Sequence, residues 1–331
     1  MSAEAVLVTG ANGFVGRAVV RRLLQQRQSV HAAVRSGAEP AGMASLRCFR
    51  GLDLSPQTDW AAALQGVRAV IHCAARVHML REASADPLAD FRAVNVAGTL
   101  RLAEQAARLG VQRFVFVSSI GVHGGQSGDK PFGPNDPPAP HTPYAQSKLE
   151  AEQALLALAT GTGLEVCIVR PPLVYGPDAP GNFRSLLRAV QRGIPLPFGA
   201  VNNLRSLVAV DNLADLLALC TSHPDAAGQV FLVSDGHDMS TTTLLRQVAA
   251  AAGRRTLLLP VPPAVLGRLA RWAGKGPMAQ SLLENLQVDM SSTCERLGWS
   301  PPLSVDQALT LALAPEPPAK PISETSPGRA R

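Results

Sequence analysis

Two residues of scarce types, Tyr144 and Lys148, stand four positions apart in this sequence. The 331 residues include only two tyrosines and four lysines, so a chance pairing at this spacing is improbable. The stretch Tyr144–Ala159 has a helical composition, and a spacing of four places both side chains on one helix face. An ammonium group beside a phenol, together with the positive ring of an oxidised nicotinamide, favours the phenolate. The pair therefore predicts a tyrosine that exchanges a proton with a substrate hydroxyl during hydride transfer; an exposed helix pair is the alternative.

Ser119 is the third candidate catalytic residue. It follows the expected strand Arg113–Val117, at a strand end where parallel sheets bind ligands. Its hydroxyl is expected to hydrogen-bond the substrate oxygen, and the alternative is a hydroxyl that caps the strand end. Ser118 is the less favoured of the two neighbouring hydroxyls. His123, close to Ser119 in the sequence, is expected to be structural rather than to line a substrate pocket.

A glycine-rich turn lies between the first expected strand and the first expected helix. A pyrophosphate needs free backbone N–H groups and close backbone approach, and a helix N-terminus supplies the donors. Gly10 permits a tight turn, Gly13 removes a Cβ that would block the phosphates, and Gly16 lets helix and strand pack closely. The turn therefore predicts a dinucleotide site whose contacts are Gly10, Asn12, Gly13, Phe14, Val15 and Gly16.

Residues at the ends of the next three expected strands complete the predicted cofactor site. Arg35 directly follows the second strand, where an acidic residue would favour NAD(H); the arginine favours NADP(H), through its 2′-phosphate, and leaves NAD(H) open. Asp53 and Leu54 follow the third strand and are expected to hold the adenine. Ala74 and Ala75 follow the fourth strand and are small enough for the dinucleotide to lie across them. A surface arginine and a turn-forming aspartate are the alternatives.

Composition excludes several other classes of protein. Hydrophobic residues make up 46% of the chain and charged residues 17%, which is typical of a globular protein. The net charge of +6 suits an anionic ligand, but its scatter does not predict a nucleic-acid partner. Five widely spaced cysteines, and histidines without metal-ligand spacing, indicate a cytoplasmic protein with reduced thiols and no metal site. No apolar stretch reaches about 18 residues, so neither a transmembrane segment nor a membrane partner is expected.

Apolar runs alternate with helical patterns over residues 1–170, which predicts an α/β fold: a Rossmann-type doubly wound parallel sheet that binds NAD(P). The expected strands are Ala5–Thr9, Val30–Val34, Leu46–Arg50, Ala69–Cys73, Arg113–Val117 and Glu165–Val169. The expected helices between them are Phe14–Gln26, Trp60–Leu64, Phe91–Leu109 and Tyr144–Ala159. Gly124–Pro143 is rich in Gly, Pro and Asp and predicts a long loop.

Residues 171–313 predict a smaller, mostly helical lobe that covers the strand ends and binds the substrate, with some interleaving between the two units. Its expected elements are the helices Asn182–Gln191, Asn212–Thr221, Thr241–Ala252, Pro263–Ala273 and Ala279–Leu286 and the short strand Gln229–Val233. Residues 314–331 are rich in proline and polar residues and predict a disordered tail.

These motifs together resemble the extended branch of the short-chain dehydrogenase/reductase superfamily, from about Val6 to Leu309. The resemblance implies a Rossmann domain with a C-terminal lobe that binds a nucleotide-sugar, expected to be UDP-linked. It implies that Asn95 kinks its helix within the cofactor site, and that Asn182 and Arg205 contact the diphosphate of the substrate. It also implies a homodimer formed through a four-helix contact. The motifs that carry it are Thr9–Gly16, His72–Ala75, Asn95, Ser119, Tyr144 with Lys148, Arg170-Pro171-Pro172, Tyr175-Gly176-Pro177, Arg205, Val210-Asp211 and Leu297-Gly298-Trp299.

Within this branch the chain is similar to bacterial UDP-sugar 4-epimerases and to the 4-keto-reductases of surface-polysaccharide synthesis. Ile120 and Gly121 stand where the 4,6-dehydratases carry an acidic pair, and Gly121 also stands where the 3,5-epimerase/reductases carry a cysteine. These differences argue against dehydration and against 3,5-epimerisation, and the remaining reaction type is hydride transfer at a single carbon of the sugar. Arg35 narrowly favours reduction of a UDP-4-keto-hexose, often N-acetylated and 6-deoxy, over a UDP-hexose 4-epimerase with tightly bound NAD. A non-catalytic NADP-sensing regulator and an enzyme for a steroid-like or flavonoid-like substrate are remote alternatives.

Overall fold

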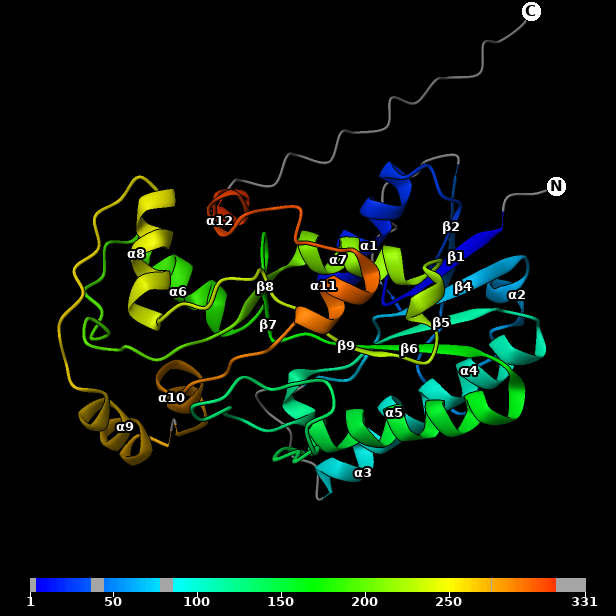
Figure 1. Ribbon diagram of the computed structural model, residues 1–331, viewed down its shortest axis with the longest axis horizontal. Helices are drawn as coiled ribbons and strands as arrows, with labels where there is room; N and C mark the ends of the chain where they lie inside the picture. The colour runs from blue at the N-terminus through cyan, green and yellow to red at the C-terminus, as the bar shows by residue number, and fades with distance from the viewer. Residues whose placement is uncertain (1–3, 37–44, 78–85, 275, 314–331) are drawn as a thin grey trace, which may run out of the picture.

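The computed structural model describes residues 4–36, 45–77, 86–274 and 276–313. A seven-stranded parallel sheet with the order β3-β2-β1-β4-β5-β6-β9 forms its centre (Figure 1). The predicted α/β fold with a doubly wound sheet is confirmed, and the first six strands differ from their predicted bounds by at most two residues at either end. The strands are β1 (Ala5–Thr9), β2 (Val30–Val34), β3 (Leu46–Arg50), β4 (Val67–His72), β5 (Arg113–Val117), β6 (Glu165–Arg170) and β9 (Val230–Leu232).

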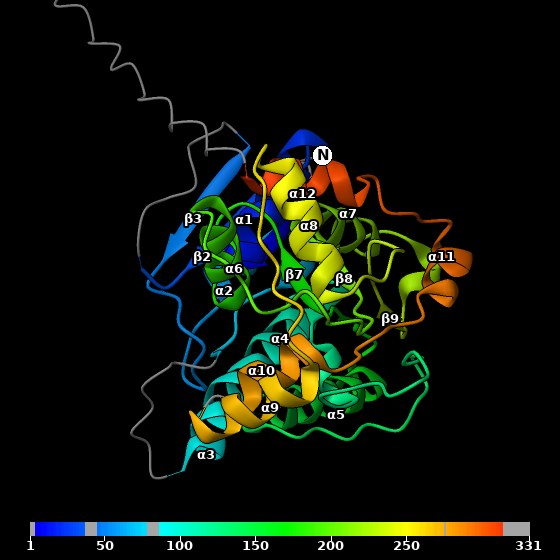
Figure 2. The same ribbon diagram turned by 90° about the vertical axis from the view of Figure 1, so that its left-hand side faces the viewer.

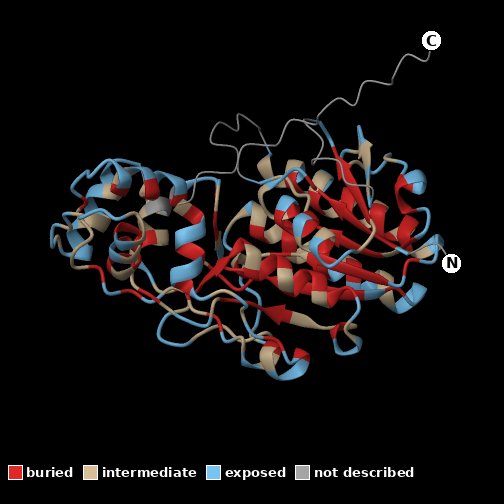
Figure 3. Cartoon of the chain, turned by 90° about the horizontal axis from the view of Figure 1, so that it is seen from above, coloured by how far each residue is buried: buried red, intermediate tan, exposed pale blue. Residues whose placement is uncertain are grey.

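Helices cover both faces of this sheet because its central strands are apolar on both sides. All residues of β1 and β2 are buried. One face packs against α1 (Phe14–Gln25) and α7 (Val210–Cys220). The other packs against α2 (Ala61–Leu64), α4 (Thr99–Arg108) and α5 (Pro143–Thr162). Buried residues are accordingly concentrated in the sheet and in the helix surfaces that face it (Figure 3).

The strand order reverses direction between β1 and β4, which are neighbours in the sheet although β2 and β3 separate them in the sequence. Their register places Thr9 opposite His72 at the carboxyl ends of the two strands. In open α/β sheets such a reversal leaves a crevice where ligands bind, because the connections leave the strands in opposite directions. The glycine-rich turn follows β1 and therefore lies at this point.

The predicted helix Phe91–Leu109 is three segments rather than one. A short helix, α3 (Pro87–Phe91), leads into a π-helix, η1 (Arg92–Gly98), and then into α4. The π-helix ends where the chain passes very close to Leu54: a Cβ on Gly98 would lie 2.7 Å from the carbonyl carbon of Leu54. The wider π-helical turn is the kink that the family resemblance implied for Asn95, and π-helical turns are frequent at functional sites.

The smaller lobe contains a second sheet that the sequence did not predict. In it, β7 (Leu173–Tyr175) pairs in parallel with β8 (Leu207–Ala209). The helices α6 (Asn182–Gln191), α8 (Thr241–Ala251) and α12 (Val305–Leu313) pack around this sheet and share its apolar core. The helices α9 (Pro263–Trp272) and α10 (Gly276–Leu283) pack on each other at the outer end of the lobe (Figures 1 and 2).

The two units interleave, because the chain returns to the large sheet after residue 170. Both α7 and β9 belong to the second half of the sequence, yet they pack on or join the seven-stranded sheet.

The remaining short helices are η2 (Ile120–Val122), η3 (Pro224–Ala226) and α11 (Ser291–Leu297). Residues 124–142, within the predicted loop, form turns and one β-bridge that joins Phe132 to Val288. The predicted tail, residues 314–331, lies outside the described residues.

Candidate active site

The glycine turn packs so closely that it has no room for side chains. Gly10 has φ +63°, and a Cβ there would lie 2.9 Å from the Cα of Ala74. A Cβ on Gly16 would lie 2.1 Å from the carbonyl oxygen of Gly10. The helix α1 begins directly after Gly13 and has no acidic residue in its first turn, so its N-terminal N–H groups can receive an anion. The shape of this turn and its free backbone donors suit the diphosphate of a dinucleotide, and the cofactor contact itself stays a prediction.

A buried hydrogen-bond chain holds the ends of β1 and β4 together beside this turn. The Nδ1 of His72 is 2.7 Å from the hydroxyl of Thr9, and its Nε2 is 2.9 Å from the hydroxyl of Thr99. Burial lowers the pKa of His72 to about 3, so the ring is neutral and serves as a hydrogen-bonding link. Ala74 and Ala75 follow directly and are half-buried. Their small side chains leave the strand end open for a dinucleotide.

The three residues predicted near the adenosine lie at the ends of β2 and β3. Arg35 is exposed and has no ion pair with any residue that the structure describes. Asn12 donates a 2.5 Å hydrogen bond to the carbonyl of Ser36, which ties the glycine turn to the segment that carries Arg35. Asp53 is exposed and accepts a 2.6 Å hydrogen bond from Thr58, whereas Leu54 is half-buried against the π-helix. Within the described part of the chain, no carboxylate occupies the guanidinium of Arg35, which could therefore receive an anion.

The predicted catalytic residues come together where α5 meets the ends of β4 and β5. Thr142 caps the first turn of α5, accepting a 3.1 Å hydrogen bond from the backbone of Ala145, and thereby sets the position of Tyr144. Lys148, one turn further on, is only 2% exposed, and its ammonium lies 3.9 Å from the ring centroid of Phe116 on β5. A face of the aromatic ring stabilises the cation there.

Ser119 lies in a turn that packs directly against the start of α5. It caps the short helix η2, accepting a 3.1 Å hydrogen bond from the backbone N–H of Gly121. A Cβ on Gly121 would lie 3.3 Å from the Ser119 hydroxyl and 3.5 Å from the Cβ of Ala145, the residue after Tyr144. Glycine at 121 therefore lets the serine turn approach the tyrosine helix, and the three predicted catalytic residues share one region.

The protein groups alone do not produce the phenolate that the Tyr144–Lys148 pair was expected to favour. Burial raises the pKa of Tyr144 to about 12, and the same burial lowers the pKa of Lys148 to about 7. Desolvation is the largest cause of both shifts, and for Lys148 it outweighs the attraction of the Glu152 carboxylate. Ionisation of Tyr144 at neutral pH therefore requires a further positive charge, which an oxidised nicotinamide carries.

Asn95 in the π-helix positions the catalytic helix. Its side-chain oxygen accepts a 2.8 Å hydrogen bond from the backbone N–H of Arg76, and its amide donates to the Arg76 carbonyl and to the hydroxyl of Ser147. Ser147 lies between Tyr144 and Lys148 on α5. All these bonds go to protein groups, so the structure ties Asn95 to the geometry of the pair, while its predicted contact with the cofactor stays a prediction.

Behind Lys148 lies a buried ionic network that the sequence did not predict. Glu152, one turn after Lys148, is 2% exposed and forms a bidentate pair with Arg170, with distances of 3.0 and 2.5 Å. The hydroxyl of Ser118 donates to the same carboxylate, and Arg170 donates a 2.8 Å hydrogen bond to His123. Burial and Arg170 lower the pKa of His123 to about 4, so His123 is the neutral structural residue that was expected. The repeat of Tyr144, Lys148 and Glu152 at intervals of four was the one sequence signal for this network.

Arg205 lies at the candidate substrate site in the smaller lobe. Its guanidinium donates a 3.1 Å hydrogen bond to the carbonyl of Glu284 and has no carboxylate partner among the described residues. Burial lowers its pKa to about 10. It borders a cavity of about 100 Å³ together with Phe183, Met239 and Leu282. A half-buried cation without an anionic partner is a suitable clamp for a diphosphate. Asn182 begins α6 nearby in the chain, but its side chain lies outside the described part of the structure.

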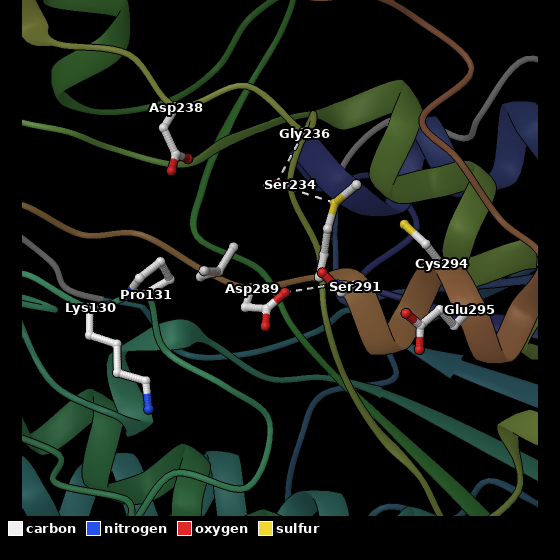
Figure 4. A pocket seen from close by; sticks show the side chains of 11 residues that line it. Lys130, Pro131, Ser234, Gly236, Asp238, Asp289, Ser291, Cys294 and Glu295 are labelled. Atoms are coloured by element: carbon white, nitrogen blue, oxygen red, sulfur yellow. Dashed lines mark hydrogen bonds between the residues drawn. The ribbon is translucent and has the colours of Figure 1, made fainter.

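A larger groove of about 610 Å³ contains none of the predicted site residues (Figure 4). Two of its three acidic residues already have partners: Asp289 accepts a hydrogen bond from the backbone of Ser291, and Asp238 accepts hydrogen bonds from Ser206 and Gln287. Among the described residues, no group of three or more His, Cys, Asp or Glu side chains is arranged to hold a metal ion. We therefore assign the chemistry to the region of Tyr144.

The fold and this site define an enzyme of the extended short-chain dehydrogenase/reductase type. Residues 6–234 match the NAD dependent epimerase/dehydratase family, and the chain belongs to that family. It is therefore an NAD-dependent enzyme, and the resemblance inferred from the sequence motifs is confirmed.

Three relatives show how closely the chain follows known members. It is 44% identical to a UDP-glucose 4-epimerase from Vibrio cholerae over 308 residues, which cover 92% of this chain and 93% of the relative. It is 30% identical to a 3 beta-hydroxysteroid dehydrogenase/Delta 5-->4-isomerase from Mycobacterium tuberculosis, over 93% of this chain and 89% of the relative. The solved structure of MoeE5 in complex with UDP-glucuronic acid and NAD is 28% identical, with a TM-score of 0.75, and the match covers 93% and 97% of the two chains.

Substitutions at Glu152 in the buried network and at Lys148 are expected to have opposite effects on stability. Glu152→Gln leaves the Arg170 guanidinium buried without its counter-charge, so we expect the free energy of unfolding to fall by about 3–5 kcal/mol. Lys148→Met removes a charge whose burial is unfavourable, so we expect turnover to be lost while stability is maintained or increased. Urea unfolding of the two variants beside the wild type measures both effects.

The stability difference between Lys148→Met and the wild type is expected to change with pH in a definite direction. The folded-state pKa of Lys148 is lowered to about 7, so the penalty for burying the ammonium is present below pH 7 and disappears as the pH rises toward the ordinary value of about 10.4. The stability advantage of Lys148→Met should therefore be largest near pH 6 and decrease at higher pH. An equal loss of stability in both variants would show that Lys148 is part of a net stabilising ion pair.

Proposed function

We propose that this protein is a UDP-hexose 4-epimerase that retains NAD through its catalytic cycle. One observation carries the proposal: Tyr144, Lys148 and Ser119 share one region, in a chain 44% identical over most of its length to a UDP-glucose 4-epimerase. Ile120 and Gly121, beside Ser119, have no acidic group with which to eliminate water. This set of side chains supports a hydride transfer that is later reversed at the same carbon.

The reaction balances within the site. The C4 hydroxyl of the sugar gives its proton to the Tyr144 phenolate, and the C4–H bond breaks with its electron pair. A bound NAD would supply the acceptor and donor for this pair as a hydride. Tyr144 then returns the proton to the oxygen of the 4-keto sugar after the sugar has turned its other face, so C4 is inverted with no net oxidation. The hydroxyl of Ser119 donates a hydrogen bond to the same oxygen, which orients the sugar for both steps.

The chain offers suitable groups for each part of the two ligands. The glycine turn and the N-terminus of α1 would hold the cofactor diphosphate, Ala74 and Ala75 would lie beneath the dinucleotide, and Lys148 would face the nicotinamide half. Arg205 would hold the diphosphate of UDP. This residue also separates the proposal from a steroid-type reaction like that named for the mycobacterial relative, because an uncharged substrate gives Arg205 no anionic partner.

A second candidate function, reduction of a UDP-4-keto-hexose with exchangeable NADPH, rests on Arg35. Its exposed guanidinium has no acidic partner among the described residues, and an arginine at this strand end can pair with a 2′-phosphate. The sequence alone narrowly favoured the keto-reductase over the epimerase. The similarity to a 4-epimerase and the NAD named in the related solved structure favour the epimerase.

The main proposal is tested by Tyr144→Phe. We expect interconversion of UDP-glucose and UDP-galactose to fall by about 10²–10⁴-fold, because the ring remains but can no longer exchange a proton. Bound NAD, released by denaturing the purified protein and measured by absorbance, should be unchanged. Tyr175→Phe is the matched control, since Tyr175 is the only other tyrosine and lies in the core of the smaller lobe. Near-normal turnover in Tyr144→Phe would exclude Tyr144 as the acid/base residue.

The second candidate is tested by Arg35→Ala. We expect NADPH binding to weaken about tenfold and NADH binding to change little, because only NADPH has the phosphate that the guanidinium contacts. Isothermal titration of protein stripped of cofactor measures both, with Arg108→Ala on the exposed side of α4 as the control. Equal effects of Arg35→Ala on both cofactors would remove the support that Arg35 gives to the keto-reductase.

A further inference from the structure

The basic residues of this protein are distributed unevenly. Residues 179–210 and 239–283 include ten of the 31 basic residues and none of the 25 acidic residues. The rest of the chain, with 21 basic and 25 acidic residues, is slightly acidic. These two segments form most of the smaller lobe, including α6, α8, α9 and α10 at one end of the molecule (Figure 1). The net positive charge of the chain is therefore concentrated in the smaller lobe.

At the outer end of this lobe, the helix α9 presents large apolar side chains to solvent. Val265, Leu269 and Trp272 are 43%, 58% and 89% exposed, and their spacing of four and three puts them on one helix face. The opposite face packs on α10, where a Cβ on Gly267 would lie 3.8 Å from Leu283. An apolar outer face reverses the usual pattern of a surface helix, whose apolar side faces the protein.

Trp272 is unusual within this protein as well. The two other tryptophans, Trp60 and Trp299, are 1% and 6% exposed. The segment that leads into α9 adds Leu257 and Leu259, which are also exposed. Neighbouring positions carry exposed arginines, namely Arg254, Arg255, Arg268 and Arg271. The end of the lobe thus combines a strip of apolar side chains with a surrounding positive charge.

From this combination we infer that α9 is a membrane-surface helix that docks the protein on an anionic lipid bilayer. Val265, Leu269 and Trp272 enter the boundary between headgroups and acyl chains, and Arg268 and Arg271 contact the lipid phosphates. A short amphipathic helix with tryptophan and leucine on one side and arginine beside them has the composition of helices that lie in this interface. Each basic residue near an anionic surface adds favourable electrostatic free energy.

A second copy of the chain suits this surface less well. In a two-fold symmetric dimer the same surface faces itself, so contact through α9 would bring together two surfaces built from segments without acidic residues. The charge around α9 therefore calls for an anionic partner. A bilayer supplies negative charge and an apolar interior without requiring a complementary groove on the partner.

This docking places the protein on the membrane surface, whereas the length of the apolar stretches in the sequence predicted no membrane partner. In the part of the chain that the structure describes, no helix is long and apolar enough to cross a membrane. The ten residues of α9 would lie parallel to the bilayer plane. The proposal is independent of the reaction catalysed, because none of its residues belongs to the candidate active site.

The test is co-sedimentation of the full chain with vesicles of phosphatidylcholine alone or mixed in equal parts with phosphatidylglycerol. We expect binding to the anionic vesicles only, with a blue shift in tryptophan emission because Trp272 is the exposed tryptophan. Leu269→Glu/Trp272→Glu should reduce the partition coefficient at least about tenfold, and Arg268→Glu/Arg271→Glu should have a similar effect. Leu311→Glu, at an exposed leucine on α12, is the matched control and should bind like the wild type.

Three results would overturn the inference. One is failure of the wild-type chain to bind anionic vesicles, and another is undiminished binding by Leu269→Glu/Trp272→Glu. The third is that analytical ultracentrifugation shows the wild-type chain to self-associate and that only Leu269→Glu/Trp272→Glu abolishes this association. A second copy of the chain would then be the partner that covers α9. Thermal unfolding of every variant confirms that the fold is intact, and all the substituted side chains are exposed.

Discussion

The ammonium group of Lys148 is buried at the ends of β4 and β5, and a buried charge is unfavourable unless its surroundings compensate it. The ring of Phe116 and the carboxylate of Glu152 provide only part of that compensation, because the pKa of Lys148 is still lowered, and Glu152 in turn is held by Arg170. These contacts run from β5 through α5 to β6. They fix the rotation of the helix that also carries Tyr144, so the position of the acid/base residue depends on an ion pair that takes no part in proton transfer.

The need to hold α5 in one position also explains the π-helix and the close-packed glycine turns around the site. The π-helix brings Asn95 to Ser147, between the two catalytic residues, and a regular α-helix would place that side chain elsewhere on the turn. Gly121 lets the Ser119 turn approach α5, and the glycine turn after β1 leaves the adjacent strand end clear. These turns keep large side chains away from the strand ends near Lys148, while Tyr144 by itself remains protonated at neutral pH.

The sequence predicted the large sheet well because strands buried on both faces are continuous apolar runs with recognisable ends. It missed β7 and β8, which are only three residues long and have no periodicity to detect. The pairing of Glu152 with Arg170 joins a helix to a strand, so only the folded topology reveals it. The sequence predicted a helix over Pro263–Ala273, but not that its large apolar side chains face solvent, since their direction depends on how α9 packs against α10.

In the proposed reaction a sugar is oxidised and reduced again at C4 without leaving the site. The most direct measurement follows UDP-glucose that carries deuterium at C4, incubated with the purified protein and no added cofactor. We expect UDP-galactose with the deuterium still at C4, because the electron pair and its hydrogen return to the same carbon. Product that has lost the label to solvent, or turnover only when NADPH is added, would contradict it.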